Sequence, residues 1–416
     1  MGGVNRMNGG ADLPALRSHN AALVLDLLRA AGADGISRLE LAERTGLTPQ
    51  AVSKITARLR EQGLAAEAGR RASTGGKPRT LLRLVPEAGH AVGVHLDRDE
   101  LRAVLVDLRG TVVGERCAPL DLRPGEGARR VVSALEREVA PLLAQLRADA
   151  PPGGGAPPGA GTPPGAGTPP GAGTPPEPGG RPGAGGTLLG VGVALPGPLD
   201  HVRGVLHRVT GFPEWDGFPL RDAVAARLGV PVLVDKDTNA AALGPAVAGE
   251  PDGEAGQGGT GRSFAYLHLG TGLGAGLVIG GSVHRGARTG AGEFGHQVIR
   301  LDGPVCGCGN RGCIEALCLA AVARGDLPEA ARVLGVGAAN LVGLLDIDLV
   351  LLGGRTVAAA PEVFVREVDA VVRDRVRRQG RAQDSVPVRI AGGGEFGVAV
   401  GAAQLVLGAV FGRPQG

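Results

Sequence analysis

Apolar residues recur at helical spacing in two segments near the start of the chain. Residues 16–31 carry apolar side chains at helical spacing (Leu23, Leu27, Leu28 and Ala31), which predicts a helix. Ser37, followed three residues later by Glu40, is a capping box, in which each side chain accepts a hydrogen bond from the backbone N–H of the other residue. A second helix is therefore predicted to begin at this box and to end near Gly46, because glycine adopts the left-handed conformation without strain.

A third helix is predicted directly after this turn. Thr48 supplies its N-cap and Pro49 its first helical position, and the pattern continues to Gly63. One stripe of this helix is apolar and consists of Val52, Ile55 and Leu59. The opposite face carries Gln50, Ser53, Lys54, Ala57 and Arg58. A helix, a tight turn and a second helix with polar residues near its start are typical of a helix-turn-helix, whose second helix enters the major groove of DNA.

Two short strands are predicted next, over residues 64–68 and 80–85, with a basic loop between them. This hairpin is typical of the wing of a winged helix, and its cations are placed to meet phosphates or the minor groove. Residues 1–85 hold thirteen Lys and Arg against seven Asp and Glu, a net charge of +6, whereas the remaining residues sum to −3. The alternative is a small helical packing domain with a basic surface. We predict DNA contacts through Gln50, Ser53, Lys54, Arg58, Arg71, Lys77 and Arg79.

The rest of the chain has the pattern of a mixed α/β protein. Strands are predicted over residues 91–96 and 101–108, and a helix over residues 128–148. Residues 151–186 are a Pro- and Gly-rich tract with almost no apolar residues, which we interpret as a disordered insert because it cannot offset the entropy of ordering. Residues 187–414 return to strands and helices. We expect two domains, a winged helix-turn-helix over residues 12–86 and a second domain over residues 87–414.

The sequence also bears on where in the cell the protein is located. No apolar run reaches the ~18–20 residues that a membrane-spanning helix needs. The first twelve residues lack the basic and apolar pattern of a secretory signal, so we expect a cytoplasmic protein that has no membrane partner.

Three of the five cysteines lie close together, downstream of a histidine. His296, Cys306, Cys308 and Cys313 have the spacing H-x9-C-x-C-x4-C. Thiolates and imidazole are the preferred ligands of Zn²⁺, and four of them make a closed tetrahedral site without a position for water. The pattern therefore predicts a structural zinc ion; the alternative is a set of reduced, buried cysteines without a metal.

Five further segments lie at the ends of predicted strands or beside the cysteines. They are residues 193–200 (VALPGPLD), 234–240 (VDKDTNA), 269–276 (LGTGLGAG), 293–296 (EFGH) and 312–315 (GCIE). These motifs, in this order and over nearly the whole chain, resemble the ROK family (repressors, open reading frames and sugar kinases). With a winged helix in front of them, the chain is similar to the xylose- and N-acetylglucosamine-type repressors of that family. The resemblance implies a two-lobed, actin-like (ribonuclease H-like ATPase) sugar-kinase fold for the second domain.

The resemblance also assigns roles to particular residues. It implies that Glu293, His296 and Glu315 bind the hydroxyls of a hexose, with His296 also a zinc ligand, and that Asp237 stands where the kinases keep their catalytic base. Carboxylates suit such a site because charge-assisted hydrogen bonds are strong. The chain departs from the family at Lys236, where an asparagine is usual. A cation there is expected to change the sugar, to favour an anionic or phosphorylated one, or to abolish sugar binding.

A second departure concerns phosphoryl transfer. The glycine-rich run of Gly270, Thr271, Gly272 and Gly274 is suited to cradle phosphate, and we interpret it as a residual phosphate loop. The family kinases carry a second such loop, Asp-x-Gly-Gly-Thr, where residues 95–99 here read His-Leu-Asp-Arg-Asp. The glycines are gone and carboxylates would repel polyphosphate. We therefore expect no kinase activity and no catalytic residues, with Asp237 a vestigial base.

Three functions remain open. The preferred interpretation is a transcriptional regulator of carbohydrate metabolism genes, most simply a repressor, whose affinity for operator DNA changes when a sugar or sugar phosphate binds. We expect a homodimer or homotetramer, since paired winged helices match two-fold DNA half-sites. The alternatives are an ATP-dependent sugar kinase that retains a DNA-binding domain, and a constitutive DNA-binding protein that has lost its sugar or responds to a protein partner instead.

Overall fold

The computed structural model describes residues 19–71, 79–120, 127–148, 186–207, 215–248, 262–380 and 386–413. The Pro- and Gly-rich tract lies outside these residues apart from Gly186, as do the first three residues of the first predicted helix. Within the described residues, no helix is both long enough and apolar enough to cross a membrane.

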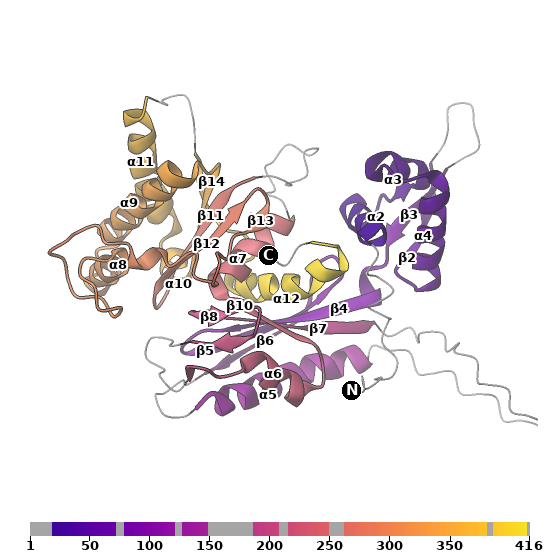
Figure 1. Cartoon of the computed structure of the whole chain (residues 1–416), viewed down its shortest axis with the longest axis horizontal. Helices are drawn as coiled ribbons and strands as arrows, with labels where there is room; N and C mark the ends of the chain where they lie inside the picture. Colours follow the sequence, from indigo (N-terminus) through magenta and orange to yellow (C-terminus); the bar gives the residue numbers. More distant parts are fainter. Residues whose placement is uncertain are drawn as a thin grey trace, which may run out of the picture.

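The N-terminal part is a winged helix, as predicted. Three helices pack against a small sheet with the strand order β1-β3-β2 (Figure 1): α2 (His19–Ala31), α3 (Arg38–Thr45), α4 (Pro49–Glu61), β1 (Ile36–Ser37), β2 (Ala65–Arg71) and β3 (Arg79–Leu84). The capping box of Ser37 and Glu40 is present, and Gly46 closes α3 in the left-handed conformation with φ 68°. Thr48 caps α4 through the backbone N–H of Ala51. These local signals place the turn between α3 and α4.

A short 3-10 turn, η1 (Pro86–Ala88), leads into the first of two five-stranded sheets. The sheet has the order β10-β7-β4-β5-β6, in which β4, β5 and β6 are antiparallel while β7 and β10 run parallel to β4. Its strands are β4 (Gly89–Leu96), β5 (Glu100–Asp107), β6 (Val112–Pro119), β7 (Thr187–Leu195) and β10 (Val232–Lys236). Two helices cover one face, α5 (Gly127–Ala148) and α6 (Leu220–Leu228). We call this sheet with its two helices the first lobe.

The second sheet repeats the same arrangement. Its order is β13-β12-β11-β14-β15, with an antiparallel half and a parallel half. The strands are β11 (Phe264–Leu269), β12 (Leu273–Ile279), β13 (Ser282–Val283), β14 (Leu349–Gly353) and β15 (Val388–Ile390). One face is covered by α8 (Ile314–Ala323), α9 (Leu327–Leu345) and α11 (Pro361–Arg378), and α10 (Arg355–Ala359) follows β14. We call this unit the second lobe. Two sheets of the same order confirm the predicted two-lobed α/β fold.

Two helices lie between the sheets and join the lobes. They are α7 (Asp237–Ala248) and α12 (Gly397–Val410), which pack on each other (Figure 1). Glycines allow this close approach: a Cβ on Gly192 of β7 would lie 1.9 Å from the carbonyl oxygen of Ala402, and one on Gly401 would lie 1.8 Å from that of Ala240. The N-terminus of α7, which carries Asp237, is therefore in the same packed layer as α12.

The end of α12 also contacts the winged helix. Arg413 and Arg29 both donate to Asp26 of α2, at 3.2 and 3.0 Å, and the guanidinium of Arg29 lies 5.3 Å from the centre of the Phe411 ring. Phe411 is 5% exposed and belongs to a hydrophobic cluster that includes Leu25 and Leu28 of α2. The winged helix therefore shares a core with the helix that joins the two lobes.

Candidate functional site: a cleft between the lobes

The four predicted sugar-site residues line one cleft between the lobes. Asp237 begins α7, Glu293 precedes the 3-10 turn η3 (Phe294–His296), and Glu315 lies in the first turn of α8; these residues line the cleft together with His296. Thr271, Gly272 and Gly274 of the predicted phosphate loop line it too, whereas Gly270 does not. Residues far apart in the sequence thus meet because strand ends and helix starts gather at the same edge of the two sheets.

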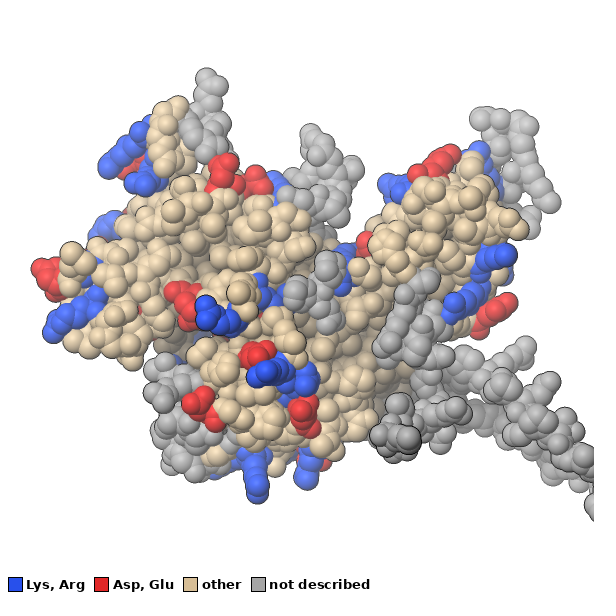
Figure 2. Space-filling view, viewed as in Figure 1, with Lys and Arg blue, Asp and Glu red and all other residues tan. Residues whose placement is uncertain are grey.

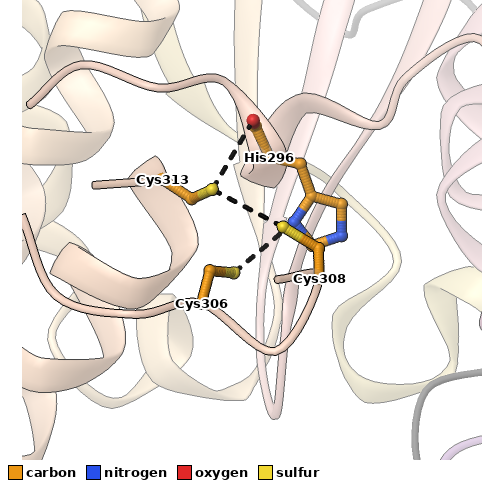
Figure 3. A group of neighbouring side chains, drawn as sticks. All are labelled: His296, Cys306, Cys308 and Cys313. Atoms are coloured by element: carbon orange, nitrogen blue, oxygen red, sulfur yellow. Dashed lines mark hydrogen bonds between the residues drawn. The ribbon is translucent and has the colours of Figure 1, made fainter. Parts of the chain in front are cut away.

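The predicted metal ligands also come together. One ligand atom from each of His296, Cys306, Cys308 and Cys313 lies within 4.8 Å of all the others (Figure 3). The sulfur of Cys306 is 3.7 Å from Nδ1 of His296, and the sulfurs of Cys308 and Cys313 are 3.7 Å apart. Cys306 and Cys313 are buried. Four soft donors at this separation match the donor set of a structural zinc site.

The loop that carries the cysteines is held by its own backbone. The N–H of Cys306 donates to the carbonyl of Asn310 at 2.8 Å, and the N–H of Gly309 donates to the carbonyl of Cys306. Gly312 has φ 68°, and a Cβ on it would lie 1.5 Å from the carbonyl oxygen of Arg300, so only glycine fits there. Burial raises the pKa of the Cys313 thiol to about 12, whereas a hydrogen bond from the Asn310 backbone lowers the pKa of Cys308.

Glu315 connects the cysteine loop (residues 306–313) with the glycine turn between β11 and β12 (residues 270–274). One carboxylate oxygen accepts a hydrogen bond from the backbone N–H of Leu273 at 2.9 Å, and the other lies 3.8 Å from the sulfur of Cys306. A Cβ on Gly272 would lie 3.2 Å from the Glu315 carboxylate, so the turn between β11 and β12 passes close above it. Glu315 is thus oriented by both neighbours at the bottom of the cleft.

Lys236, the departure noted in the sequence, pairs with a predicted sugar ligand. Its ammonium lies 3.1 Å from a carboxylate oxygen of Glu293 and also donates to the carbonyl of Ala291, and its side chain is 3% exposed. Its stem passes under Gly197, where a Cβ would lie 2.8 Å from the lysine Cδ. The cation is therefore neutralised within the cleft wall. The motif analysis did not foresee this pairing, because residues 236 and 293 lie in different lobes.

A buried ion pair supports this wall from behind. Asp235 accepts from Arg285 at 2.7 Å, from the amide of Asn239 at 2.8 Å and from the backbone N–H of Lys236 at 2.8 Å. Asp235 and Arg285 are 1% and 7% exposed. Buried charges that are paired and hydrogen-bonded keep a fixed geometry. The pair holds the end of β10 against the loop before Glu293, and nothing in the sequence pattern indicated it.

Asp237 has titratable neighbours that sequence reasoning did not single out as site residues. His95 is buried, burial lowers its pKa, and its Nε2 has no hydrogen-bond partner among the described residues. The hydroxyl of Tyr266 lies 3.0 Å from Nδ1 of His268, and burial raises the pKa of that tyrosine. Tyr266 and His268 are two residues apart on β11, so the alternation of the strand places both on one face. Asp237 itself accepts from the backbone N–H of Thr238 at 2.6 Å.

The remaining wall of the cleft is the turn between β4 and β5. Asp97 and Arg98 line the cleft, and the hydroxyl of Thr271 donates to Asp97 at 3.4 Å. Arg355, the first residue of α10, donates to both carboxylate oxygens of Asp99, at 2.7 and 3.2 Å. This hydrogen bonding with Arg355 lowers the pKa of Asp99.

The predicted DNA-binding residues lie on the opposite side of the winged helix from α12. Gln50, Ser53, Lys54, Ala57 and Arg58 are exposed along α4, while Val52 and Leu59 are buried; Ile55, predicted to be buried, is only partly so. Lys and Arg side chains are visible along the outer edge of this domain (Figure 2). In the wing, Arg71 pairs with Arg79 in the β2–β3 ladder and Arg79 is exposed, whereas Lys77 lies outside the described residues.

Comparisons with known proteins agree with both halves of the chain. Residues 23–65 match the model of the winged helix-turn-helix DNA-binding family, and residues 181–324 match that of the ROK family. This chain joins a winged helix-turn-helix to a ROK family domain. A protein named xylose repressor from Caldicellulosiruptor bescii is 26% identical over 385 residues, which cover 82% of this chain and 84% of that protein.

Two further likenesses concern the fold and the cleft. A crystal structure described as a ROK family transcriptional regulator, a homolog of the E. coli MLC protein, superposes with a TM-score of 0.69 at 20% identity, covering 96% of this chain and 97% of that chain. The likeness shows that the whole arrangement of winged helix and lobes is a known fold. A glucokinase from Thermotoga maritima is 40% identical over 140 residues, which cover 33% of this chain and 42% of that enzyme. Part of the chain is therefore similar to a sugar kinase, whereas most of the chain is similar to a protein named xylose repressor.

Proposed function

We propose that this chain is a sugar-responsive transcriptional regulator, acting as a repressor, whose ROK domain senses the sugar. The observation that carries the proposal is the shared core between the two halves: α12 packs on α7 at the cleft and belongs to the same hydrophobic cluster as α2, which the residues directly after α12 contact. The similarity to a xylose repressor along 82% of the chain supports it. The sugar is held by Asp237, Glu293, His296 and Glu315, and operator DNA by the exposed face of α4 and the wing.

The coupling follows from this packing. A sugar changes DNA affinity only if it favours one arrangement of the lobes over another. Asp237 is the first residue of α7. At Gly401, α12 packs so closely on α7 that no side chain larger than glycine fits, so a shift of the lobes moves α12. The contacts of Phe411 and Arg413 with α2 then carry that shift to the winged helix. In a homodimer the shift alters the spacing of two recognition helices over two half-sites.

We assign the cysteine cluster to a structural zinc ion. His296, Cys306, Cys308 and Cys313 would hold it, and the ion would supply charge that stabilises the thiolates and fixes the imidazole ring. Nδ1 of His296 faces Cys306, and the residue also lines the cleft. The metal would thus orient His296, a residue that binds the sugar, without taking part in a reaction.

The test is retrieval of the DNA that the protein binds across its genome, followed by gel shift on the best site with a panel of sugars and sugar phosphates. The proposal expects one specific site whose affinity changes with one sugar. Specific DNA binding without any sugar response would contradict the sensor half of the proposal, and the absence of specific binding would contradict the whole.

A substitution in α4 tests the DNA contact directly. Lys54→Ala removes an exposed cation near the start of the recognition helix and is expected to weaken operator binding about 5- to 100-fold, as loss of a good DNA contact does. Arg332→Ala is the matched control, because Arg332 pairs with Glu329 on the same helix, α9, far from the winged helix. Equal operator affinity of the two variants at physiological salt would show that α4 does not read the DNA.

A sugar kinase is the second candidate, because Asp237 and the glycine turn line the same cleft and a glucokinase matches part of the domain. The acidic turn at Asp97 and Asp99 opposes it, since like charges repel polyphosphate. Incubation with ATP and the sugar that elicits a response in gel shift decides between the two: formation of sugar phosphate would establish the kinase.

A further inference from the structure

The two lobes are tied together by charged contacts at one end of the cleft. Arg355 of the second lobe makes a two-pronged contact with Asp99 of the first lobe, at 2.7 and 3.2 Å, and lies 3.6 Å from Asp97. The hydroxyl of Thr271, in the second lobe, donates to Asp97 at 3.4 Å. The contact residues are separated by 174 to 258 positions in the chain. These contacts therefore exist only while the two lobes face each other.

A second contact on the same strand pair strengthens the tie. Arg102 of β5 donates to Glu395 at 2.8 Å, and its guanidinium lies 5.5 Å from the centre of the Phe396 ring. Glu395 and Phe396 form the 3-10 turn η4 (Gly394–Phe396), which directly precedes α12. The turn between β4 and β5 and its neighbouring residues thus contact both the start of α10 and the start of α12.

The contacts of Asp97 and Asp99 with Thr271 and Arg355 lie where the turn between β4 and β5 faces the glycine turn. Glycine turns with free backbone N–H groups bind anions, but here the carboxylates of the facing turn occupy that side and pair with Arg355. A phosphate-bearing ligand at this end would have to displace the ion pair. The cleft is consequently open to a ligand at the end with Glu293 and Glu315 and bridged by protein at the end with Asp97.

We infer that Arg355, Asp97 and Asp99 form a clasp that holds the lobes together in place of a nucleotide, so that a sugar binds this cleft without any co-ligand. The clasp is a positioning device. Among the residues that the structure describes, it makes no hydrogen bond or ion pair with those that bind the sugar, and it acts by keeping the two lobes close enough for residues of both lobes to reach one sugar. The sugar-affinity arm of this inference rests on the proposed function, whereas the clasp itself is tested without sugar or DNA.

The strength expected of such a clasp is modest. The side chains of Arg355 and Asp99 are 46% and 58% exposed, so water and salt screen the pair. An exposed ion pair of this kind changes an equilibrium about two- to fivefold. That range suits a reversible closure, because a much stronger tie would keep the lobes shut whether or not a sugar is present.

The first experiment measures hydrogen exchange in the full-length, sugar-free protein. Arg355→Ala is expected to raise the exchange rates of amides in residues 97–101 and 270–274 about two- to fivefold. Arg332→Ala removes an equally exposed arginine that pairs with Glu329 inside one helix, and it is expected to leave those amides unchanged. Unchanged exchange in Arg355→Ala, or the same change in both variants, would overturn the clasp.

A charge-swapped pair separates attraction from mere packing. Arg355→Glu alone is expected to open the cleft further than Arg355→Ala, because it repels Asp97 and Asp99. Adding Asp99→Arg restores an opposite-charge pair and is expected to return exchange towards the wild-type rate. Failure of the double variant to recover any protection would show that the ion pair does not hold the lobes.

The last measurement is calorimetric titration with D-xylose, D-glucose, N-acetyl-D-glucosamine and their phosphates, each without nucleotide. The sugar that binds the wild type is expected to bind Arg355→Ala about two- to fivefold more weakly, with a difference that shrinks at high salt. Addition of a non-hydrolysable ATP analogue is expected to leave the wild-type affinity unchanged; an increase would overturn the inference. If neither these sugars nor their phosphates bind the wild type, the sensor assignment fails, while hydrogen exchange still decides on the clasp.

Discussion

The two ends of the cleft are built in different ways. At the end that holds the proposed metal and sugar ligands, His296, the three cysteines and Glu315 come from twenty consecutive residues, and two of the cysteines are buried. At the other end, Asp99 and Arg355 come from different lobes and remain about half exposed. The first end is a compact local structure that tolerates little change. The second is a reversible contact between rigid bodies, which is where a regulated closure is expected to lie.

The largest expected effect comes from removing a metal ligand. Cys308→Ser deletes one of four donors, so zinc content is expected to fall from about one ion per chain to nearly none. The melting temperature is expected to drop by roughly 5–10 °C, because the loop loses the ion that holds it together. Elemental analysis and calorimetry measure the two quantities.

Cys117→Ser is the matched control for this change. Cys117 is exposed on β6 in the first lobe, away from the cluster, so its replacement should preserve both metal content and melting temperature. A wild-type protein that carries no zinc would remove the metal assignment, and with it the contrast between a metal-braced end and an ion-paired end.

A smaller effect is expected from Asp237→Asn, which keeps the shape of the side chain and its hydrogen bond to the N–H of Thr238. The neutral amide accepts a sugar hydroxyl more weakly than the charged carboxylate does, which weakens binding about 10-fold. Calorimetric titration of the sugar measures this change. Hydrogen exchange in residues 97–101 should stay at the wild-type rate, since Asp237 takes no part in the clasp. A variant that loses clasp protection along with sugar affinity would show that the two ends are not independent.

The smallest effect concerns pH. The contact with Arg355 lowers the pKa of Asp99 from its ordinary value of 3.8, so the clasp is fully present above that value and is lost only as pH falls through the lowered pKa. Between about pH 8 and pH 6 the clasp therefore contributes a constant amount, and exchange in residues 97–101, corrected for the intrinsic rate, should not change. A change of closure within that window would mean that another group, such as a histidine of the cleft, controls it.

Much of the fold was predictable because its signals are local. The capping box at Ser37, the N-cap at Thr48 and the left-handed Gly46 each act within a few residues, and the structure has all three. The strands β4 and β5 and the helix α5 were likewise expected from periodicity. The strand β6 was not predicted; it is exposed along most of its length and shows no alternation of buried and exposed residues.

The candidate site was predictable to a smaller extent. Residue types and spacing indicated the four metal ligands, and the structure brings them within 4.8 Å of each other. The resemblance to a family indicated the sugar residues, and all four line one cleft. The contacts that support them were missed: the pairing of Lys236 with Glu293, and the buried pair of Arg285 and Asp235 behind the cleft wall. Those contacts join segments about fifty residues apart, and no spacing rule links such positions.

By itself, the sequence determined the local chemistry: the helix-turn-helix, the zinc-type ligand spacing and the absence of glycine from residues 95–99. Caps, turns and chelating loops depend on neighbours within one or two turns of chain, so their residues are sufficient to define them. Only the tertiary structure decided that Arg355 meets Asp99 and that α12 shares a core with the winged helix. These contacts depend on how two sheets and two helices pack in space. The spacing of residues along the chain does not specify that packing.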